Sequence, residues 1–331
     1  MNGPPAAAKA VLDPLKKLWD STPKEARAAL NAVFSRDAPI KLAHPFETLD
    51  GPEAFFKDAL GPLYAAMPDL ERRETIRMAG PDGRGQMWVG LCGAYIGTFE
   101  APWLGIPPTG RTAHMRFHEF FRVDGDRAVE MQALWDIPEL MMQAGAWPMV
   151  PSLGREWHVP GPNAQDGLSV SGDGSAALKT VGDMLTGLSR STEGVAAMQL
   201  DRYWHPRASW YGPSSIGTAR GIKGFRAHHQ APFLAAMPDR RGLVDEGHFF
   251  GEGDYVGFTA WPGMEMTLSG SGWLGLPPTD TKLTMRSLDF WRVEGDLIRE
   301  NWVLVDMLHV YAQLGVDVLA RMRELPPHWG D

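Results

Sequence analysis

Two carboxylates near the end of each half of the chain are the side chains best suited to chemistry. Glu119 and Asp136 flank one Gly-Asp turn, and Asp289 and Asp306 flank another. A base that removes a proton next to a carbonyl group must lie within hydrogen-bond reach of that C–H. An exposed aspartate, with a pKa of about 4, is a weak base, but burial in an apolar pocket and a second carboxylate nearby both raise the pKa. The sequence therefore predicts general acid–base chemistry, with Asp306 as the acid/base and Asp289 as its partner. Asp136 and Glu119 form the equivalent pair, either active or vestigial.

The aspartates also have a purely structural alternative. Asp306 directly precedes MLHVYAQLG and Asp136 precedes IPELMMQAG, two segments with helical character. An aspartate in front of a helix can accept hydrogen bonds from the free backbone N–H groups of the first turn. Helix capping therefore stays open as the role of both residues.

Each carboxylate pair is expected on a β-hairpin that turns at Gly-Asp. With the first turn at the tip, Phe121 lies opposite Glu130 and Glu119 lies opposite Gln132. Because side chains alternate along a strand, one face of each hairpin should carry the carboxylates. That face is predicted to hold Glu119, Glu130, Gln132 and Asp136 in the first hairpin, and Asp289, Glu300, Trp302 and Asp306 in the second. The other face of the first hairpin should hold Arg116, His118, Phe120 and Arg122.

Aromatic and polar side chains near these strands are expected to shape the pockets. The candidates for substrate binding are Trp302, Trp210, Tyr211, His229, Trp291 and Gln132. His114 and His118 share a strand face, but no carboxylate joins them at the spacing of a metal site. We therefore interpret them as exposed or interface residues, and we expect no bound metal.

The elements that hold these residues occur twice. Three strings recur 170 residues further on: AAMPD from residue 65, WLGIPPT from residue 103 (returning as WLGLPPT) and FFRVDGD from residue 120 (returning as FWRVEGD). Repetition without a gap indicates duplication of a whole domain. We predict a first domain at 1–145, a linker rich in Pro and Gly at 146–175 and a second domain at 176–331.

Helical segments precede strands in each copy. Thr22-Pro23 predicts a helix start before KEARAALNAVF, and Ser191-Thr192 predicts the corresponding start in the second copy. Another helix is expected near 52–66, and strands separated by Gly-containing turns follow it. Helices first and hairpins after them predict an α+β fold with an antiparallel sheet in each copy.

These strings together resemble the SnoaL-like polyketide cyclases of the nuclear transport factor 2 superfamily. The likeness rests on WLGIPPTG, on FWRVEGD with the following E-x-W-x-x-x-D, and on Q-L-G six residues later. The first copy has Gln132 in place of the tryptophan in that pattern. The resemblance implies two cone-shaped, curved sheets, each wrapped by about three helices, with a pocket in the mouth of the cone. It also implies cofactor-free aldol ring closure, with an aspartate on the last strand, at the positions of Asp136 and Asp306, as acid/base.

Composition narrows the classes of partner. A formal net charge of −8 argues against nucleic-acid binding, which needs a basic face. No apolar run approaches about 18 residues and the N-terminus lacks the order of a signal peptide, so we expect a cytoplasmic protein that does not contact membranes. Cys92 is the only cysteine, which excludes a disulfide within the chain. No nucleotide-binding or nucleophile-elbow motif is present, so no cofactor is expected.

The leading hypothesis is a cofactor-free cyclase, isomerase or lyase that acts on a small hydrophobic carbonyl compound. A first alternative is a non-catalytic protein of the same fold that binds small molecules or serves in assembly. A second alternative is an epoxide or ester hydrolase, which needs a carboxylate-activated water and a second acid. The duplication further predicts an internal pseudo-dimer that replaces the homodimer of single-copy relatives, and further homo-oligomerisation stays open.

Overall fold

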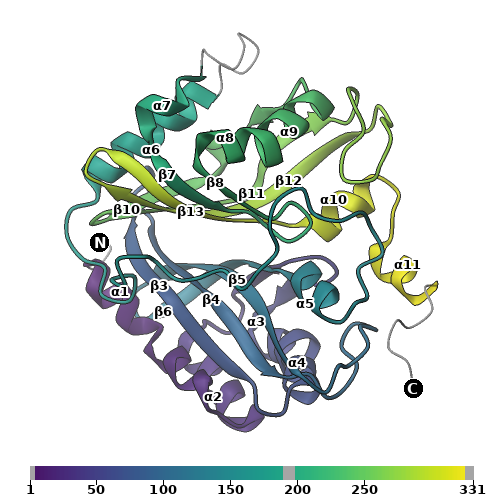
Figure 1. Cartoon of the computed structure of the whole chain (residues 1–331). Helices are drawn as coiled ribbons and strands as arrows, with labels where there is room; N and C mark the ends of the chain where they lie inside the picture. Colours follow the sequence, from purple (N-terminus) through teal and green to yellow (C-terminus); the bar gives the residue numbers. More distant parts are fainter. Residues whose placement is uncertain (1–3, 189–197, 325–331) are drawn as a thin grey trace.

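The computed structural model of the chain describes residues 4–188 and 198–324. Two domains of the same architecture, domain 1 and domain 2, follow each other along the chain (Figure 1). Domain 1 contains α1 (Pro5–Val11), η1 (Asp13–Trp19), α2 (Pro23–Val33), β1 (Pro39–Leu42), β2 (Glu47–Asp50), α3 (Gly51–Phe55), η2 (Phe56–Leu60), α4 (Gly61–Ala66), β3 (Glu71–Pro81), β4 (Met87–Thr98), β5 (Thr112–Asp124), β6 (Arg127–Trp135) and α5 (Ile137–Gln143).

Domain 2 repeats this order after a segment that joins the two domains. It contains α6 (Ser175–Leu188), α7 (Leu200–Tyr203), β7 (Trp204–Tyr211), β8 (Thr218–Arg220), α8 (Gly221–Phe225), η5 (Arg226–Gln230), α9 (Ala231–Ala236), β9 (Arg241–Gly242), η6 (Val244–Glu246), β10 (His248–Glu252), β11 (Tyr255–Thr267), β12 (Lys282–Glu294), β13 (Leu297–Val305), α10 (Met307–Gln313) and α11 (Val318–Glu324). The helix start predicted at Ser191-Thr192 lies outside the described residues.

Each domain has one sheet, and helices precede the long hairpins as predicted. The strand orders are β2-β1-β6-β5-β4-β3 in domain 1 and β10-β11-β12-β13-β7-β8 in domain 2, with β9 paired to β11. The sheets are mixed rather than purely antiparallel, because β1 runs parallel to β6 and β7 runs parallel to β13. Four other strands separate β1 from β6 along the chain and five separate β7 from β13, so no hairpin forces the parallel partners to run antiparallel.

The predicted cap at Thr22 is confirmed. The Thr22 side chain accepts a hydrogen bond from the backbone N–H of Glu25 (3.3 Å), and the Glu25 carboxylate accepts one from the backbone N–H of Thr22 (2.8 Å). This reciprocal pair satisfies two backbone donors at the start of α2. The capped helix then buries Ala26, Leu30 and Val33 against the sheet side of domain 1.

The two sheets pack against each other, with α2 and α4 on the outer side of domain 1 and α8 and α9 on the outer side of domain 2 (Figure 1). Phe120 of β5 stacks on Phe290 of β12, with 4.7 Å between ring centroids. Gly90 permits this contact, because a Cβ added there would meet Phe290 at 2.8 Å and Phe120 at 3.0 Å. The chain therefore forms the internal pseudo-dimer that its duplication predicted.

A β-bulge in both long hairpins overturns the predicted strand register. At the tip Asp124 lies opposite Arg127, but beyond the bulge Phe121 lies opposite Met131 and Glu119 lies opposite Ala133. The prediction that Glu119 shares a face with Glu130, Gln132 and Asp136 is therefore wrong, because a shift of one residue exchanges the faces of a strand. The second hairpin is bulged at the matching place, and Asp289 lies opposite Val303 rather than Trp302.

The bulge sorts the polar residues between two faces. Glu119 and Asp289 point toward the helices of their own domains, together with the apolar residues of the interior. The opposite faces, which meet between the domains, carry Arg116, His118, Phe120, Gln132 and Asp136 in domain 1, and Phe290, Trp302 and Asp306 in domain 2.

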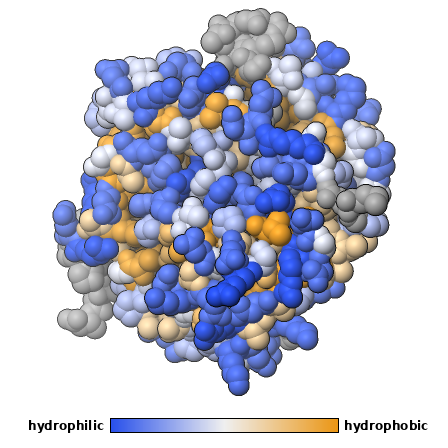
Figure 2. Space-filling view, turned by 180° about the vertical axis from the view of Figure 1, so that it is seen from behind, coloured by the Kyte–Doolittle hydropathy of each residue, from blue (hydrophilic) through white to orange (hydrophobic). Residues whose placement is uncertain are grey.

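The outer surface shows no large apolar region on the face drawn in Figure 2. Hydrophilic residues predominate there, and apolar residues form scattered patches between them. Within the described ranges, no helix is long and apolar enough to cross a membrane.

Candidate active site

Domain 2 encloses a cavity of about 340 Å³ between its helices and its sheet. Helical residues from α6, α8, η5 and α9 form one wall, and β7, β11, β12 and β13 form the other. Most of the lining is aromatic or aliphatic, as in typical small-molecule sites. Beside His229, the aromatic part of that lining consists of Trp204, Trp210, Phe225, Phe233, Phe258, Trp273 and Trp291.

Asp289 of β12 is the carboxylate of this cavity. Its residue is only 8% exposed, and burial raises the pKa of the carboxyl group to about 8. Interactions with the side chains of Ser287 and Asn301 lower the pKa and offset part of that effect. No basic group among the described residues contributes to the pKa of Asp289. The carboxyl group therefore titrates near neutral pH, where it can both donate and accept a proton.

His229 of η5 lies in the helical wall of the same cavity. Its imidazole stacks on Trp210 at 4.3 Å and on Phe233 at 5.5 Å between ring centroids. Burial, together with the nearby charge of Arg240, lowers the pKa of His229 to about 3. The ring is therefore neutral at physiological pH, and its Nδ1 has no hydrogen-bond partner within the described structure.

Several other buried polar atoms of the lining also lack a protein partner among the described residues. They are Nε1 of Trp204, Nε1 of Trp291, Nε of Arg240 and Oε1 of Gln230. Three of these four atoms belong to N–H donors. Because a buried donor without a partner is costly, this lining favours a ligand that brings hydrogen-bond acceptors.

The equivalent space in domain 1 is closed. Only about 10 Å³ remains there, between η1 and the sheet. Glu119 forms an ion pair with Arg72 and accepts hydrogen bonds from the hydroxyl of Tyr95 (3.1 Å) and the indole N–H of Trp135 (3.2 Å). Leu15 and Leu18 of η1 fill the space beside this network. Glu119 is therefore fully occupied by the protein itself.

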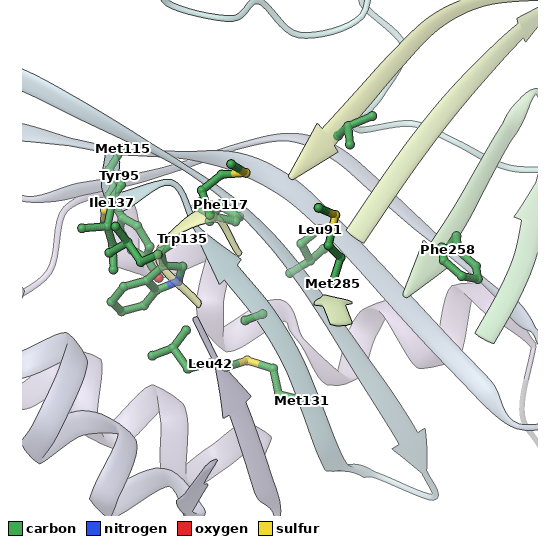
Figure 3. Packing of buried hydrophobic residues seen from close by; sticks show 14 of the residues in the cluster. Leu42, Leu91, Tyr95, Met115, Phe117, Met131, Trp135, Ile137, Phe258 and Met285 are labelled. Atoms are coloured by element: carbon green, nitrogen blue, oxygen red, sulfur yellow. The ribbon is translucent and has the colours of Figure 1, made fainter. Parts of the chain in front are cut away.

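Large side chains surround this network on the domain 1 strands. Figure 3 shows Tyr95, Met115, Trp135 and Ile137 gathered at one end of the packed interior. Tyr95 and Trp135 meet edge to face, with 5.1 Å between their centroids. The interior of domain 1 is therefore packed like an ordinary core.

Asp306 and Asp136 lie outside both interiors and join the two domains. The Asp306 carboxylate accepts hydrogen bonds from the backbone N–H of His44 in domain 1 (2.9 Å) and from Arg286 (3.1 Å). In the mirrored arrangement, Asp136 pairs with Arg116 and accepts a hydrogen bond from the backbone N–H of Ser214 (3.0 Å). Neither aspartate lines the domain 2 cavity. The catalytic role predicted for them is untested, but this position gives them no route to a ligand there.

The capping alternative applies to one of the two aspartates. Asp306 accepts a hydrogen bond from the backbone N–H of His309, in the first turn of α10 (3.2 Å). Asp136 precedes α5 but makes no such bond. Helix capping is thus confirmed for Asp306 and wrong for Asp136.

The predicted substrate-binding residues separate into two groups. Trp210, His229 and Trp291 line the domain 2 cavity. Trp302 and Tyr211 pack on each other at the domain interface, 5.3 Å apart. Gln132 also lies there, where its amide oxygen accepts a hydrogen bond from Thr259 (2.8 Å). The bulge explains the misplacement of Trp302 and Gln132, because it turns every second residue of β6 and β13 toward the opposite domain.

His118 likewise lies at the interface between the domains. The prediction for it was an exposed or an interface position, and the second of these is correct. Its Nδ1 hydrogen bonds to the backbone carbonyl of Leu288 in the other domain (2.7 Å). Among the described residues, no group of three or more His, Cys, Asp or Glu side chains could hold a metal ion.

Sequence reasoning missed Arg241 and four other polar residues of the cavity. A comparison of the two copies could have found these four, because each is polar in domain 2 and apolar 170 residues earlier. The pairs are Ser287 and Phe117, Asn301 and Met131, Gln230 and Leu60, and Arg240 and Leu70. Polar residues that replace core residues on one face mark the copy that kept a cavity.

Comparison with known proteins agrees with this architecture. The SnoaL-like polyketide cyclase family model matches residues 15–144 and again residues 185–314. No protein of curated function matches the chain. Similar solved structures include IdmH, a candidate polyketide cyclase from Streptomyces antibioticus, at 22% identity and a TM-score of 0.35, covering 41% of this chain and 98% of IdmH. AclR, a candidate hydroxylase from Streptomyces galilaeus, has 20% identity and a TM-score of 0.37, covering 45% of this chain and 87% of AclR. Because the family model matches both halves, the chain belongs to the SnoaL-like polyketide cyclase family, as a tandem duplication of its domain.

Proposed function

We propose that domain 2 is a cofactor-free acid–base enzyme and that Asp289 is its general acid/base. The substrate is a small hydrophobic carbonyl compound that enters the cavity between the helices and the sheet. The reaction is a ring closure, isomerisation or elimination that starts with removal of a proton next to the carbonyl group. The family to which the chain belongs favours ring closure among these.

The environment of Asp289 is the observation that carries the proposal. A carboxyl group with a pKa of about 8 is a stronger base when ionised than an exposed aspartate, and it also returns the proton readily. Burial in an apolar cavity produces this shift without a second carboxylate. We therefore keep the predicted general acid–base catalysis, but assign the role of acid/base to Asp289 instead of Asp306.

The first step follows from the atoms that face the cavity. The ionised carboxylate of Asp289 takes the proton from the carbon next to the carbonyl group, and the electron pair of that C–H bond forms an enolate. Trp291 lies two residues along the same strand face. Its indole N–H, which has no partner among the described residues, would donate to the enolate oxygen. In ring closure the enolate carbon then attacks a second carbonyl carbon, and the new alkoxide takes the proton back from Asp289.

Domain 1 would have a structural role. Its carboxylate is bound by Arg72, and its cavity is filled by η1, so it supports domain 2 rather than catalysing a reaction. The hydrolase alternative is less well supported, because Asp289 is the single carboxylate among the described residues that line the cavity. A hydrolase of the predicted type would need a second acid there.

Deuterium exchange into 2-tetralone, a small two-ring ketone, tests the proposal without knowledge of the natural substrate. The wild-type protein should accelerate exchange of the protons next to the carbonyl, with a rate that rises with pH and levels off above about pH 8. Asp289→Asn should lower this rate by about 100-fold or more. Asp306→Asn, measured well below its melting temperature, should keep most of it. Exchange that survives Asp289→Asn would exclude Asp289 as the general acid/base, and no acceleration by the wild type would leave domain 2 as a binding domain.

A further inference from the structure

We infer that the ligand of the domain 2 cavity is an organic acid with a flat apolar body, whose ionised oxygen pairs with Arg240. The inference rests on the proposed function only in placing the ligand in this cavity. It does not require Asp289 to act as a catalyst.

Arg240 carries a charge that the described part of the protein leaves without a carboxylate. Its Nη2 donates to the backbone carbonyl of Leu188 (3.1 Å), and its guanidinium lies 5.9 Å from the ring centre of Phe233. Its buried Nε has no partner among the described residues. Burial lowers the pKa of Arg240, and no acidic group acts in the opposite direction. A half-buried guanidinium whose Nε is buried without a partner among the described residues is stabilised by an anion that approaches from the cavity.

The neighbouring arginine shows the contrast. Arg241 also borders the cavity, but it is mostly exposed and forms an ion pair with Glu265 (2.7 Å). Of these two consecutive arginines, Arg241 has a carboxylate partner in the protein, and Arg240 has none among the described residues.

Domain 1 shows what the same interior does when the protein supplies the anion. There Arg72 and Glu119 form a buried ion pair across the closed space. Glu119 occupies the position of Asp289, but the position of Arg240 is taken by the buried Leu70. In domain 2 the arginine comes from the helical side and the carboxyl group from the sheet, with the cavity open for a ligand.

The remaining lining describes the body of this acid. His229 is neutral and lies between the rings of Trp210 and Phe233, so the helical wall is flat, aromatic and almost uncharged apart from Arg240. The unpaired N–H donors of Trp204 and Trp291 add places for further ligand oxygens. A planar ring compound with an acidic oxygen satisfies the arginine and covers the apolar surface at once.

Binding of 2-naphthoate and of its neutral near-isostere 2-naphthamide tests the inference. The two compounds differ only in the charged group, and quenching of the cavity tryptophans reports their binding. At pH 6 Asp289 is protonated and does not repel the carboxylate. The wild type should bind 2-naphthoate about tenfold or more tightly than 2-naphthamide, as expected for a charge-assisted hydrogen bond.

Three variants complete the test. Arg240→Gln should remove the preference for the acid while leaving the affinity for 2-naphthamide unchanged, Arg240→Lys should restore part of it, and Arg241→Gln should keep it. Equal affinity of the wild type for both compounds, or failure to bind either, would overturn the inference. A preference that survives Arg240→Gln, or an equal loss of both ligands in that variant, would overturn it as well. Exchange of 2-tetralone, a neutral ketone, tests the catalytic proposal, and the preference for 2-naphthoate over 2-naphthamide tests this inference, so a failure of one is distinguishable from a failure of the other.

Discussion

At the scale of single residues, Asp289 and Asp306 show how environment divides the roles of one residue type. Asp306 is held by Arg286 and by backbone N–H groups from both domains. These interactions use its charge for assembly. Among the described residues, Asp289 has only neutral partners, the side chains of Ser287 and Asn301, and burial raises its pKa to about 8. A buried carboxyl group without a basic partner costs stability when it ionises, and such costs are typical of functional sites.

Asp289→Asn should therefore stabilise the folded state relative to the wild type, by an amount that grows as the pH rises. Below about pH 4 the Asp289 carboxyl group is protonated in both the folded and the unfolded chain, so it has no pH-dependent effect. Between 3.8 and about 8 the unfolded chain releases this proton while the folded chain keeps it. Each pH unit then lowers the wild-type free energy of unfolding by about 1.4 kcal/mol relative to the variant. Above the folded pKa the difference is constant.

Urea unfolding of the wild type and Asp289→Asn at pH 5, 7 and 9 measures this difference. The free-energy gap in favour of the variant should grow more between pH 5 and pH 7 than between pH 7 and pH 9, because the folded carboxyl group ionises near pH 8. A gap that is independent of pH over this range would contradict the raised pKa of Asp289.

Asp306→Asn, by contrast, should destabilise the folded state. An amide in place of this carboxylate weakens the hydrogen bond from His44 and leaves the buried Arg286 with less compensation. We expect a loss of about 1–3 kcal/mol in the free energy of unfolding, with unchanged affinity for 2-naphthoate. Asp136→Asn is the matched variant in domain 1 and should behave alike, because Asp136 makes the mirrored contact with Ser214. A normal melting temperature combined with loss of 2-tetralone exchange in Asp306→Asn would return the catalytic role to Asp306.

At the scale of secondary-structure elements, the sequence predicted the turns correctly and the register wrongly. Gly125 and Gly295 have positive φ values of 59° and 62°, a conformation that glycine adopts without strain, so the hairpin tips were visible in the sequence. The bulge is different. Its extra residue, Val129 or Arg299, is an ordinary side chain that carries no mark of an irregular strand. The family resemblance and the repeat therefore predicted the fold, while the faces of β6 and β13 were reversed.

The apolar pattern of β5 and β6 could have corrected this error. On β5, Phe117 and Phe121 share one face, and Arg116, His118 and Arg122 fall on the other. On β6, Met131 and Trp135 share one face, and Glu130 and Gln132 fall on the other. Matching the apolar faces of the two strands requires the register that the bulge creates. The polar lining of the cavity was a weaker signal, since it becomes visible only when the two copies are compared position by position.

The element η1 gives a prediction that compares the two domains directly. Leu18 is buried in the closed interior of domain 1, and Leu188, its counterpart 170 residues later, borders the open cavity of domain 2. Leu18→Ala should cost about 2–5 kcal/mol of unfolding free energy, because it leaves a void in a packed core. Leu188→Ala should cost clearly less and should alter the affinity for 2-naphthamide, which Leu18→Ala should not. Equal stability losses would show that the cavity of domain 2 is packed like that of domain 1.

At the scale of the whole molecule, the chain is a pair of unequal domains joined through their sheets. The contacts are nearly symmetric: Asp136 reaches Ser214 and Asp306 reaches His44, and these positions are related by the same spacing of 170 residues. The interiors are not symmetric, since one is filled and the other hollow. A fixed partner domain lets the hollow domain carry unpaired polar groups, because stability lost in its interior is offset by burial at the interface and in domain 1.

If this coupling holds, the stacked pair of Phe120 and Phe290 should act as one unit in unfolding. Each ring is fully buried, and each rests on the other at 4.7 Å. Phe120→Ala and Phe290→Ala should each cost about 3–5 kcal/mol, and each should shift a single cooperative transition rather than split it. The double variant should lose about 0.5–3 kcal/mol less than the sum of the single variants, because the first substitution already removes the partner of the second. Calorimetry of the four proteins measures both effects. Additive losses, or a transition that separates into two in the wild type, would mean that the domains unfold independently and that domain 1 does not support the cavity of domain 2.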